Sequence, residues 1–143
     1  MPAAPSPLLA PAFALVGLTA IVWIWMYVTR TLPVLKGTLR VGDFGDPATA
    51  YPARLRWATD NFSNLFELPV LFYAWTLFAH QAGVAGDTEL ALAWIFVGSR
   101  YVHSAIHCGV NHVLARLLTY LLGALALWAL WIRLGLAVFA GGA

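Results

Sequence analysis

One stretch of the sequence, residues 56–73, combines a strongly apolar composition with four polar side chains at helical spacing. The four are Arg56, Asp60, Asn64 and Glu67. At roughly 100° per residue, one helix would place them within about 80° of one another. An ionisable group inside a membrane costs about 2.5–3.5 kcal/mol or more. We therefore expect this polar stripe to face a helix bundle, a subunit interface or a water-filled site rather than lipid.

The polar stripe also has a purely structural interpretation. Arg56 and Asp60 are four residues apart and could pair at the membrane surface. Asn64 could hydrogen-bond between helices. Glu67 favours a functional interpretation, because no basic residue lies within one turn of it on the expected helix. We expect its partner to come from another helix.

The composition is that of a helical membrane protein. Hydrophobic residues make up 62% of the 143 residues and charged residues only 10%, which argues against a soluble domain. Four spans with their loops fit this length and six do not, and the long unbroken apolar runs disfavour a membrane β-barrel. We predict an all-α integral membrane four-helix bundle that forms a single domain over residues 1–143. The expected spans are about 8–29, 61–82, 90–108 and 113–132.

Charge placement predicts the topology. The long first connection, residues 30–59, carries an excess of Lys and Arg, whereas the short hairpin at 83–89 carries acidic residues and neither Lys nor Arg. By the positive-inside rule the first loop is cytoplasmic and the N-terminus lies outside. A cleaved signal peptide competes as an interpretation of 8–29, but the segment lacks a basic n-region.

A second set of polar residues lies on the last two expected spans. Arg100, His103 and His107 fall within about 60° on one helix, and Arg116 and Tyr120 follow at the start of the next. With the polar stripe, all of them lie toward the cytoplasmic side. Arginine forks bind carboxylates, and an arginine beside a thiol stabilises the thiolate. These residue types predict a small anionic ligand at a helix interface, but they do not identify it.

Two other interpretations of the histidines remain open. His103 and His107 are four residues apart, which suits metal or haem ligation with Cys108 and His112 nearby. Each histidine could equally be a hydrogen-bonded residue of the bundle. We predict no metal, because His112 would lie nearly opposite His103 on a continuing helix. No phosphate loop appears and the net charge of +2 is small, so we predict no nucleic-acid partner.

The order of the short motifs resembles a known family. Asn64-Leu65-Phe66-Glu67 is followed by Pro69, Arg100 and His103 form an Arg-x-x-His block, and Arg116 and Tyr120 begin the last span. This pattern resembles the MAPEG superfamily, the membrane-associated proteins of eicosanoid and glutathione metabolism, and looks like a bacterial-type member. The resemblance covers nearly the whole chain.

The resemblance implies a homotrimer that binds glutathione as cosubstrate between neighbouring subunits. It implies Asn64, Glu67 and Arg100 as glutathione contacts and Arg116 as the catalytic, thiolate-stabilising residue. Further glutathione-binding candidates are Arg56, His103, His107 and Tyr120. The implied activity is that of a glutathione-dependent transferase or peroxidase acting on lipophilic substrates from the bilayer. The implied location is a bacterial inner membrane, with the site toward the cytoplasm.

Three positions depart from the family pattern. Asp60 stands where the enzymes usually carry an arginine, His107 stands where they carry a tyrosine, and Pro69 lies closer to Glu67. A second function class therefore remains, in which the chain is a non-catalytic membrane scaffold or lipid-binding trimer of the same fold. A transporter is disfavoured, because four spans without paired broken repeats offer no alternating-access architecture.

Overall fold

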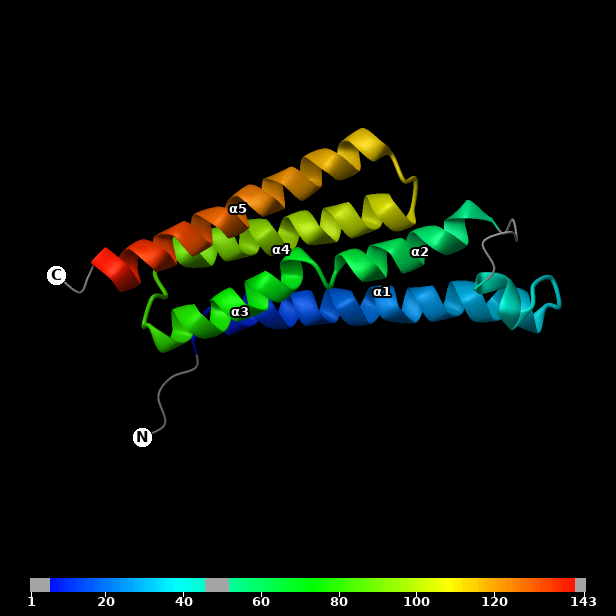
Figure 1. Cartoon of the computed structure of the whole chain (residues 1–143), viewed down its shortest axis with the longest axis horizontal. Helices are drawn as coiled ribbons and strands as arrows, with labels where there is room; N and C mark the ends of the chain where they lie inside the picture. The colour runs from blue at the N-terminus through cyan, green and yellow to red at the C-terminus, as the bar shows by residue number, and fades with distance from the viewer. Residues whose placement is uncertain (1–5, 46–51, 141–143) are drawn as a thin grey trace.

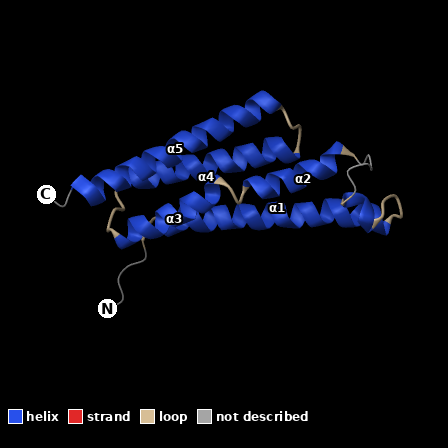
Figure 2. Ribbon diagram, in the orientation of Figure 1, coloured by secondary structure: helices blue, strands red, loops and turns tan. Residues whose placement is uncertain are grey.

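The computed structural model describes residues 6–45 and 52–140, and in this part of the chain the regular structure is entirely helical (Figure 2). The elements are α1 (Leu9–Leu35), η1 (Val41–Phe44), α2 (Ala53–Asn64), α3 (Leu68–Gln81), α4 (Asp87–Cys108) and α5 (Val113–Ala140). The long helices lie side by side in one elongated bundle (Figure 1). The α3–α4 and α4–α5 connections lie at opposite ends of it, so successive crossings alternate in direction as predicted.

Within the described residues, three helical segments are long and apolar enough to cross a membrane. They are Leu9–Leu35, Val113–Ala140 and the combined segment Ala53–Gln81, which contains α2 and α3. The first of these continues beyond the expected end near residue 29, because α1 runs through Pro33 to Leu35. The all-helical membrane fold predicted from the apolar runs is confirmed.

The second crossing differs from the single kinked helix expected at 61–82. Helix α2 begins earlier, at Ala53, and ends at Asn64, and α3 begins only at Leu68. Proline has no backbone N–H, so Pro69 cannot bond the carbonyl four residues back. Instead it lies in the first turn of α3, where an N–H would have no partner within the helix. Glu67 therefore lies in the α2–α3 break and not on the same helix as Arg56, Asp60 and Asn64, contrary to the prediction.

Among the helices of more than 20 residues, α4 is the most polar, and it lies between the other helices of the bundle. It falls outside the set of apolar candidate spans, although its 22 residues would reach about 33 Å at ~1.5 Å per residue. It packs along α5 and also contacts α1 and α2. Its polar residues Arg100, His103 and His107 are buried among these neighbours. We therefore keep the prediction that α4 crosses the membrane, covered by the rest of the bundle.

Aromatic stacking, one indole hydrogen bond and one ion pair join α3, α4 and α5. Phe72 of α3 stacks on Phe96 of α4 with ring centroids 4.8 Å apart, and the Trp75 indole N–H donates to the Leu130 carbonyl at 3.0 Å. The Arg133 Nε donates to Glu89 Oε1 at 2.7 Å. Arg133 thus joins α5 to the start of α4.

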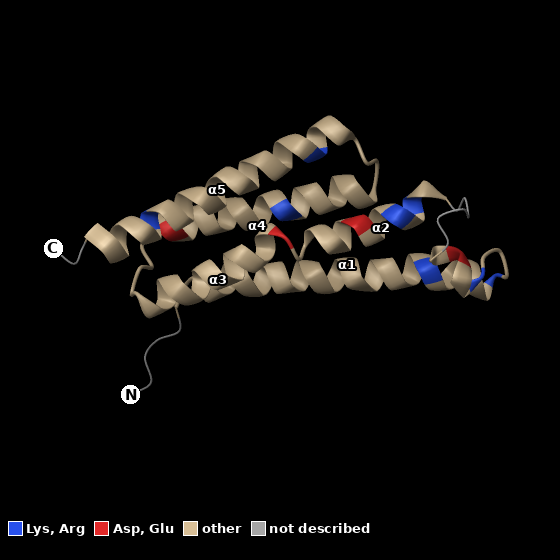
Figure 3. Cartoon of the chain, in the orientation of Figure 1, with Lys and Arg blue, Asp and Glu red and all other residues tan. Residues whose placement is uncertain are grey.

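Charged residues are unevenly distributed over the bundle. Lys and Arg gather near the end where α1 meets α2, while most of the helical surface carries no charge (Figure 3). Within this region the Arg30 guanidinium donates to Thr59 Oγ1 at 3.0 Å and lies over the Phe44 ring. These contacts fasten η1 and α2 to the last turns of α1.

Candidate functional site

Four of the predicted site residues line one small pocket between α2, α4 and α5. This polar pocket has a volume of about 250 Å³. Its lining consists of Asn64, His103, Val113, Arg116, Leu117 and Tyr120. Asn64 comes from the last turn of α2, His103 from the middle of α4, and the other residues from the first turns of α5. The α4–α5 turn brings the last two helices together here, so His103 and the lining residues of α5 share one cavity.

The turn between α4 and α5 also orients Arg116. Asn111 adopts the left-handed conformation with φ 49°, which asparagine tolerates better than most residues. Its side-chain oxygen accepts a hydrogen bond from Arg116 Nη1 at 2.6 Å. Because this contact uses one nitrogen of the guanidinium, the others remain for a ligand. Asn111 was not among the site residues predicted from the sequence.

Arg100 lies behind the polar pocket rather than in its lining. It is 1% exposed, and its guanidinium stacks 4.7 Å from the centroid of the Tyr120 ring. Its Nη2 donates to the carbonyl oxygens of Tyr120 at 3.0 Å and of Thr119 at 3.5 Å. This arginine joins α4 to α5 and holds the Tyr120 ring, so in this conformation it supports the pocket wall instead of reaching into the cavity.

The remaining predicted contacts lie apart from the polar pocket. His107 is buried one turn after His103 on α4, and the two rings meet edge to face with centroids 5.6 Å apart. Glu67 is exposed in the α2–α3 break and forms no close ion pair with Arg100. Arg56 is exposed near the start of α2. The structure of one chain therefore assembles half of the predicted site.

A buried hydrogen-bond cluster between α2 and α4 was not anticipated. Asn61 is 0% exposed; its amide donates to Cys108 Sγ at 3.5 Å, and its oxygen accepts from Ser104 Oγ at 3.3 Å. Asn61 lies one turn before Asn64, so it positions the part of α2 that contributes Asn64 to the polar pocket. Asn61 is a second amide within the apolar second span, and this feature of the sequence could have indicated the cluster. Only Asn64 was predicted as a site residue.

The metal interpretation is not supported by the arrangement of the histidines. In residues 6–45 and 52–140, no group of three or more His, Cys, Asp or Glu side chains is placed to hold a metal ion. Cys108 is engaged by Asn61, and His112 Nδ1 accepts from the Ala115 N–H at the start of α5. His103 and His107 therefore lack the further ligands that the sequence spacing suggested.

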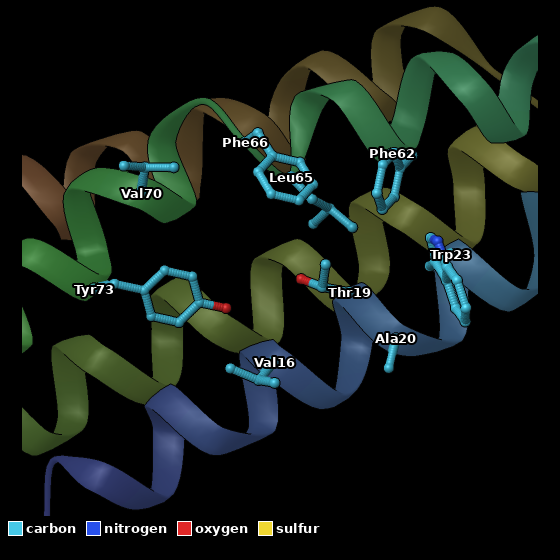
Figure 4. A pocket seen from close by; sticks show the side chains of 9 residues that line it. All are labelled: Val16, Thr19, Ala20, Trp23, Phe62, Leu65, Phe66, Val70 and Tyr73. Carbon is cyan, nitrogen blue, oxygen red and sulfur yellow. The ribbon is translucent and has the colours of Figure 1, made fainter.

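An apolar groove of about 500 Å³ lies between α1 and the α2–α3 break. Its walls are formed by Val16, Thr19, Ala20, Trp23, Phe62, Leu65, Phe66, Val70 and Tyr73 (Figure 4). Leu65 and Phe66, which directly follow Asn64, face this groove. No side chain in this lining carries a charge, so the groove suits an apolar chain and offers no group to activate a thiol.

Comparison with protein-family models gives a match over most of the chain. The model described as the MAPEG family matches residues 8–136, which include every residue of the polar pocket. No curated protein and no solved structure matches the chain.

Proposed function

Since the chain belongs to the MAPEG family, we propose that it is a membrane-embedded, glutathione-dependent enzyme that acts on lipophilic substrates. One observation carries this proposal: the polar pocket places the Arg116 guanidinium beside Asn64, His103 and Tyr120. The Arg116 cation suits an anionic ligand. The Asn64 amide and the Tyr120 hydroxyl can each donate and accept hydrogen bonds, and the His103 imidazole can accept one from a donor of the ligand. The reaction we propose is attack of the glutathione thiolate on a lipophilic electrophile, or reduction of a lipophilic peroxide.

Arg116 is the residue that we assign to thiolate stabilisation. A thiol with an ordinary pKa near 8.5 is mostly protonated at neutral pH, and a neighbouring guanidinium favours its thiolate. Arg116 is held from behind by Asn111, so its cation is positioned before a ligand arrives. Preorganised charge of this kind is more effective than charge that must reorient during the reaction.

The test is titration of glutathione into the detergent-purified protein. We expect saturable heat of binding and, in the same complex, the ultraviolet absorbance of a thiolate. S-methylglutathione, which has no ionisable thiol, should bind without producing that absorbance. Absence of binding at millimolar glutathione would overturn the proposal and favour the scaffold or lipid-binding trimer.

We also propose that the chain works as a homotrimer, on the basis of Glu67. This carboxylate is exposed in one chain, yet it lies within the apolar segment Ala53–Gln81. An uncovered charge at membrane depth costs about 2.5–3.5 kcal/mol, so a neighbouring subunit that covers Glu67 would be favoured. Assembly would also enlarge the polar pocket, which as it stands in one chain is small for a tripeptide.

Light scattering of the detergent-purified protein tests the assembly. We expect a protein mass of three copies of the 15.5 kDa chain after subtraction of the detergent. Glu67→Lys should lower the mass toward one copy, whereas Asp87→Lys, the same charge reversal at an exposed position in the first turn of α4, should leave it unchanged. A single-copy mass for the wild-type chain would contradict the trimer.

A further inference from the structure

The ring of His103 has one nitrogen engaged and one without a partner. Its Nδ1 lies 3.0 Å from the backbone carbonyl oxygen of Arg116. A carbonyl oxygen can only accept, so Nδ1 must carry the hydrogen. In the neutral imidazole, Nε2 is then the unprotonated nitrogen with a free lone pair. The α5 backbone thus fixes the tautomer of this histidine.

That free nitrogen is buried. His103 is 4% exposed, and its Nε2 has no hydrogen-bond partner in the described part of the chain. A buried acceptor without a partner is unfavourable by about 1–3 kcal/mol, and native structures rarely retain one without a ligand, water or function to explain it. The residue also lines the polar pocket, next to the guanidinium of Arg116.

The pocket-lining groups differ in what they can accept. Arg116 only donates, whereas the Asn64 amide and the Tyr120 hydroxyl can donate and accept. Neither an amide nor a phenol is a useful proton acceptor at neutral pH, because neither gains a proton readily. Because Nδ1 donates to the Arg116 carbonyl, Nε2 of His103 can only accept. His103 is therefore the pocket-lining residue that can act as a base, since the Arg116 guanidinium is already protonated. Its neighbour His107 does not line the pocket.

We propose that His103 Nε2 is the proton acceptor for the thiol bound in the polar pocket. This proposal rests on the proposed function and adds the identity of the general base. Arg116 and His103 then have separate roles, because the guanidinium stabilises the sulfur anion while the imidazole removes the proton. The Nδ1 hydrogen bond to the Arg116 carbonyl stabilises the imidazolium that forms.

The proton balance is simple. The thiol S–H bond breaks and an N–H bond forms at Nε2, which gives a thiolate beside Arg116 and an imidazolium at His103. With an activated alkene, sulfur bonds to the β-carbon and the π electrons move onto the rest of the conjugated system. The proton on Nε2 then passes to the α-carbon through the enol, so the adduct contains all atoms of both reactants.

The variant His103→Gln tests this role. A glutamine amide can still donate to the Arg116 carbonyl, so the pocket should keep its shape, but an amide is not a base. We expect glutathione affinity within about threefold of wild type and a turnover of an α,β-unsaturated ketone reduced by about 10²-fold, the lower range for a lost general base. His80→Gln, an exposed histidine at the far end of α3, is the control and should keep wild-type turnover.

The pH profile separates a base from a merely structural residue. The variant has no base to take the proton, so below the pKa of the bound thiol its turnover should rise about tenfold per pH unit as the fraction of thiolate rises. The wild type should rise much less steeply. The charged or titratable groups around His103 are Arg100 and His107 on α4 and Arg116 and Tyr120 on α5; all are unchanged in the variant. Added imidazole should restore part of the turnover of His103→Ala.

A measurement on the wild-type protein does not depend on either variant. Nitrogen NMR of labelled histidine should show Nε2 as an unprotonated nitrogen whose signal moves when glutathione binds. A signal that does not respond to bound glutathione would overturn the assignment of His103. So would a His103→Gln variant with wild-type turnover and pH profile. Failure of the wild-type protein to bind glutathione would instead overturn the proposed function itself.

Discussion

Replacing Arg116 by alanine should remove the thiolate absorbance of bound glutathione and reduce turnover by about 10²–10³-fold, the range found when a preorganised electrostatic donor is lost. Its guanidinium is the cation in the lining of the polar pocket. Without it the thiol stays protonated at neutral pH, so the nucleophile is scarce even when the tripeptide is bound. Affinity should also fall, because a charge-assisted hydrogen bond to the ligand is lost.

Two companion variants make the Arg116 result interpretable. Arg116→Lys keeps the charge but cannot bond Asn111 and the ligand at once with a planar fork, so we expect intermediate turnover. Arg54→Ala removes an exposed arginine at the start of α2 and should behave as wild type. Thermal unfolding of Arg116→Ala should change little, since the side chain is half-buried and makes one hydrogen bond. Wild-type thiolate absorbance in Arg116→Ala would assign thiolate stabilisation to another group.

Much of the fold follows from the apolar runs, but the ends of the helices do not. The start of α5 at Val113 and the end of α4 at Cys108 agree with the sequence, because a tight turn separates two apolar segments there. The end of α1 was predicted too early. Arg30 looked like a boundary residue, yet its guanidinium donates to Thr59 and lies over the Phe44 ring, and the helix continues. Those partners lie far along the chain, so local sequence could not reveal them.

The α2–α3 break shows a different limit of the sequence argument. Proline inside an apolar segment is compatible with either a kinked helix or a new helix start. On a kinked but continuous helix, Glu67 would share a face with Arg56, Asp60 and Asn64, and this was the prediction. The structure has the second, which leaves Glu67 exposed outside any helix of its own chain. A single proline thus decides whether this carboxylate lies on a helix face or in an exposed break between two helices.

The sequence predicted which residues come together at the candidate site better than it predicted what each of them does there. Asn64, His103, Arg116 and Tyr120 come together because their motifs lie near the turn that joins α4 to α5. The role of Arg100 could not be inferred from spacing. A buried guanidinium can be satisfied by backbone carbonyls and aromatic rings as well as by a ligand, and here it bonds the carbonyl of Tyr120. Which of these occurs depends on how closely two helices approach, and Gly123 sets that distance.

Gly123→Ala should therefore be one of the most damaging small substitutions in the chain. A Cβ at this position would overlap Ser99 Oγ and lie 2.9 Å from Arg100 Nη2 and 3.2 Å from its Nε. Arg100 is fully buried and bonded to the Tyr120 carbonyl, so it cannot move aside without losing that bond. We expect a loss of about 1–3 kcal/mol in the free energy of unfolding, the usual cost of overpacking. Glutathione affinity should fall as well, because Tyr120 forms a wall of the polar pocket.

Gly135, twelve residues later on the same helix, provides the matched comparison. A Cβ there would meet nothing within 4 Å, and alanine is favoured over glycine in a helix by up to about 1 kcal/mol. Gly135→Ala should therefore unfold at the wild-type temperature or slightly above it in the same detergent. If the two variants unfold at the same temperature, the close approach of α4 and α5 does not limit stability. If only Gly123→Ala is destabilised and loses affinity, the small residue on α5 is what lets Arg100 reach the backbone and hold Tyr120 against the ligand.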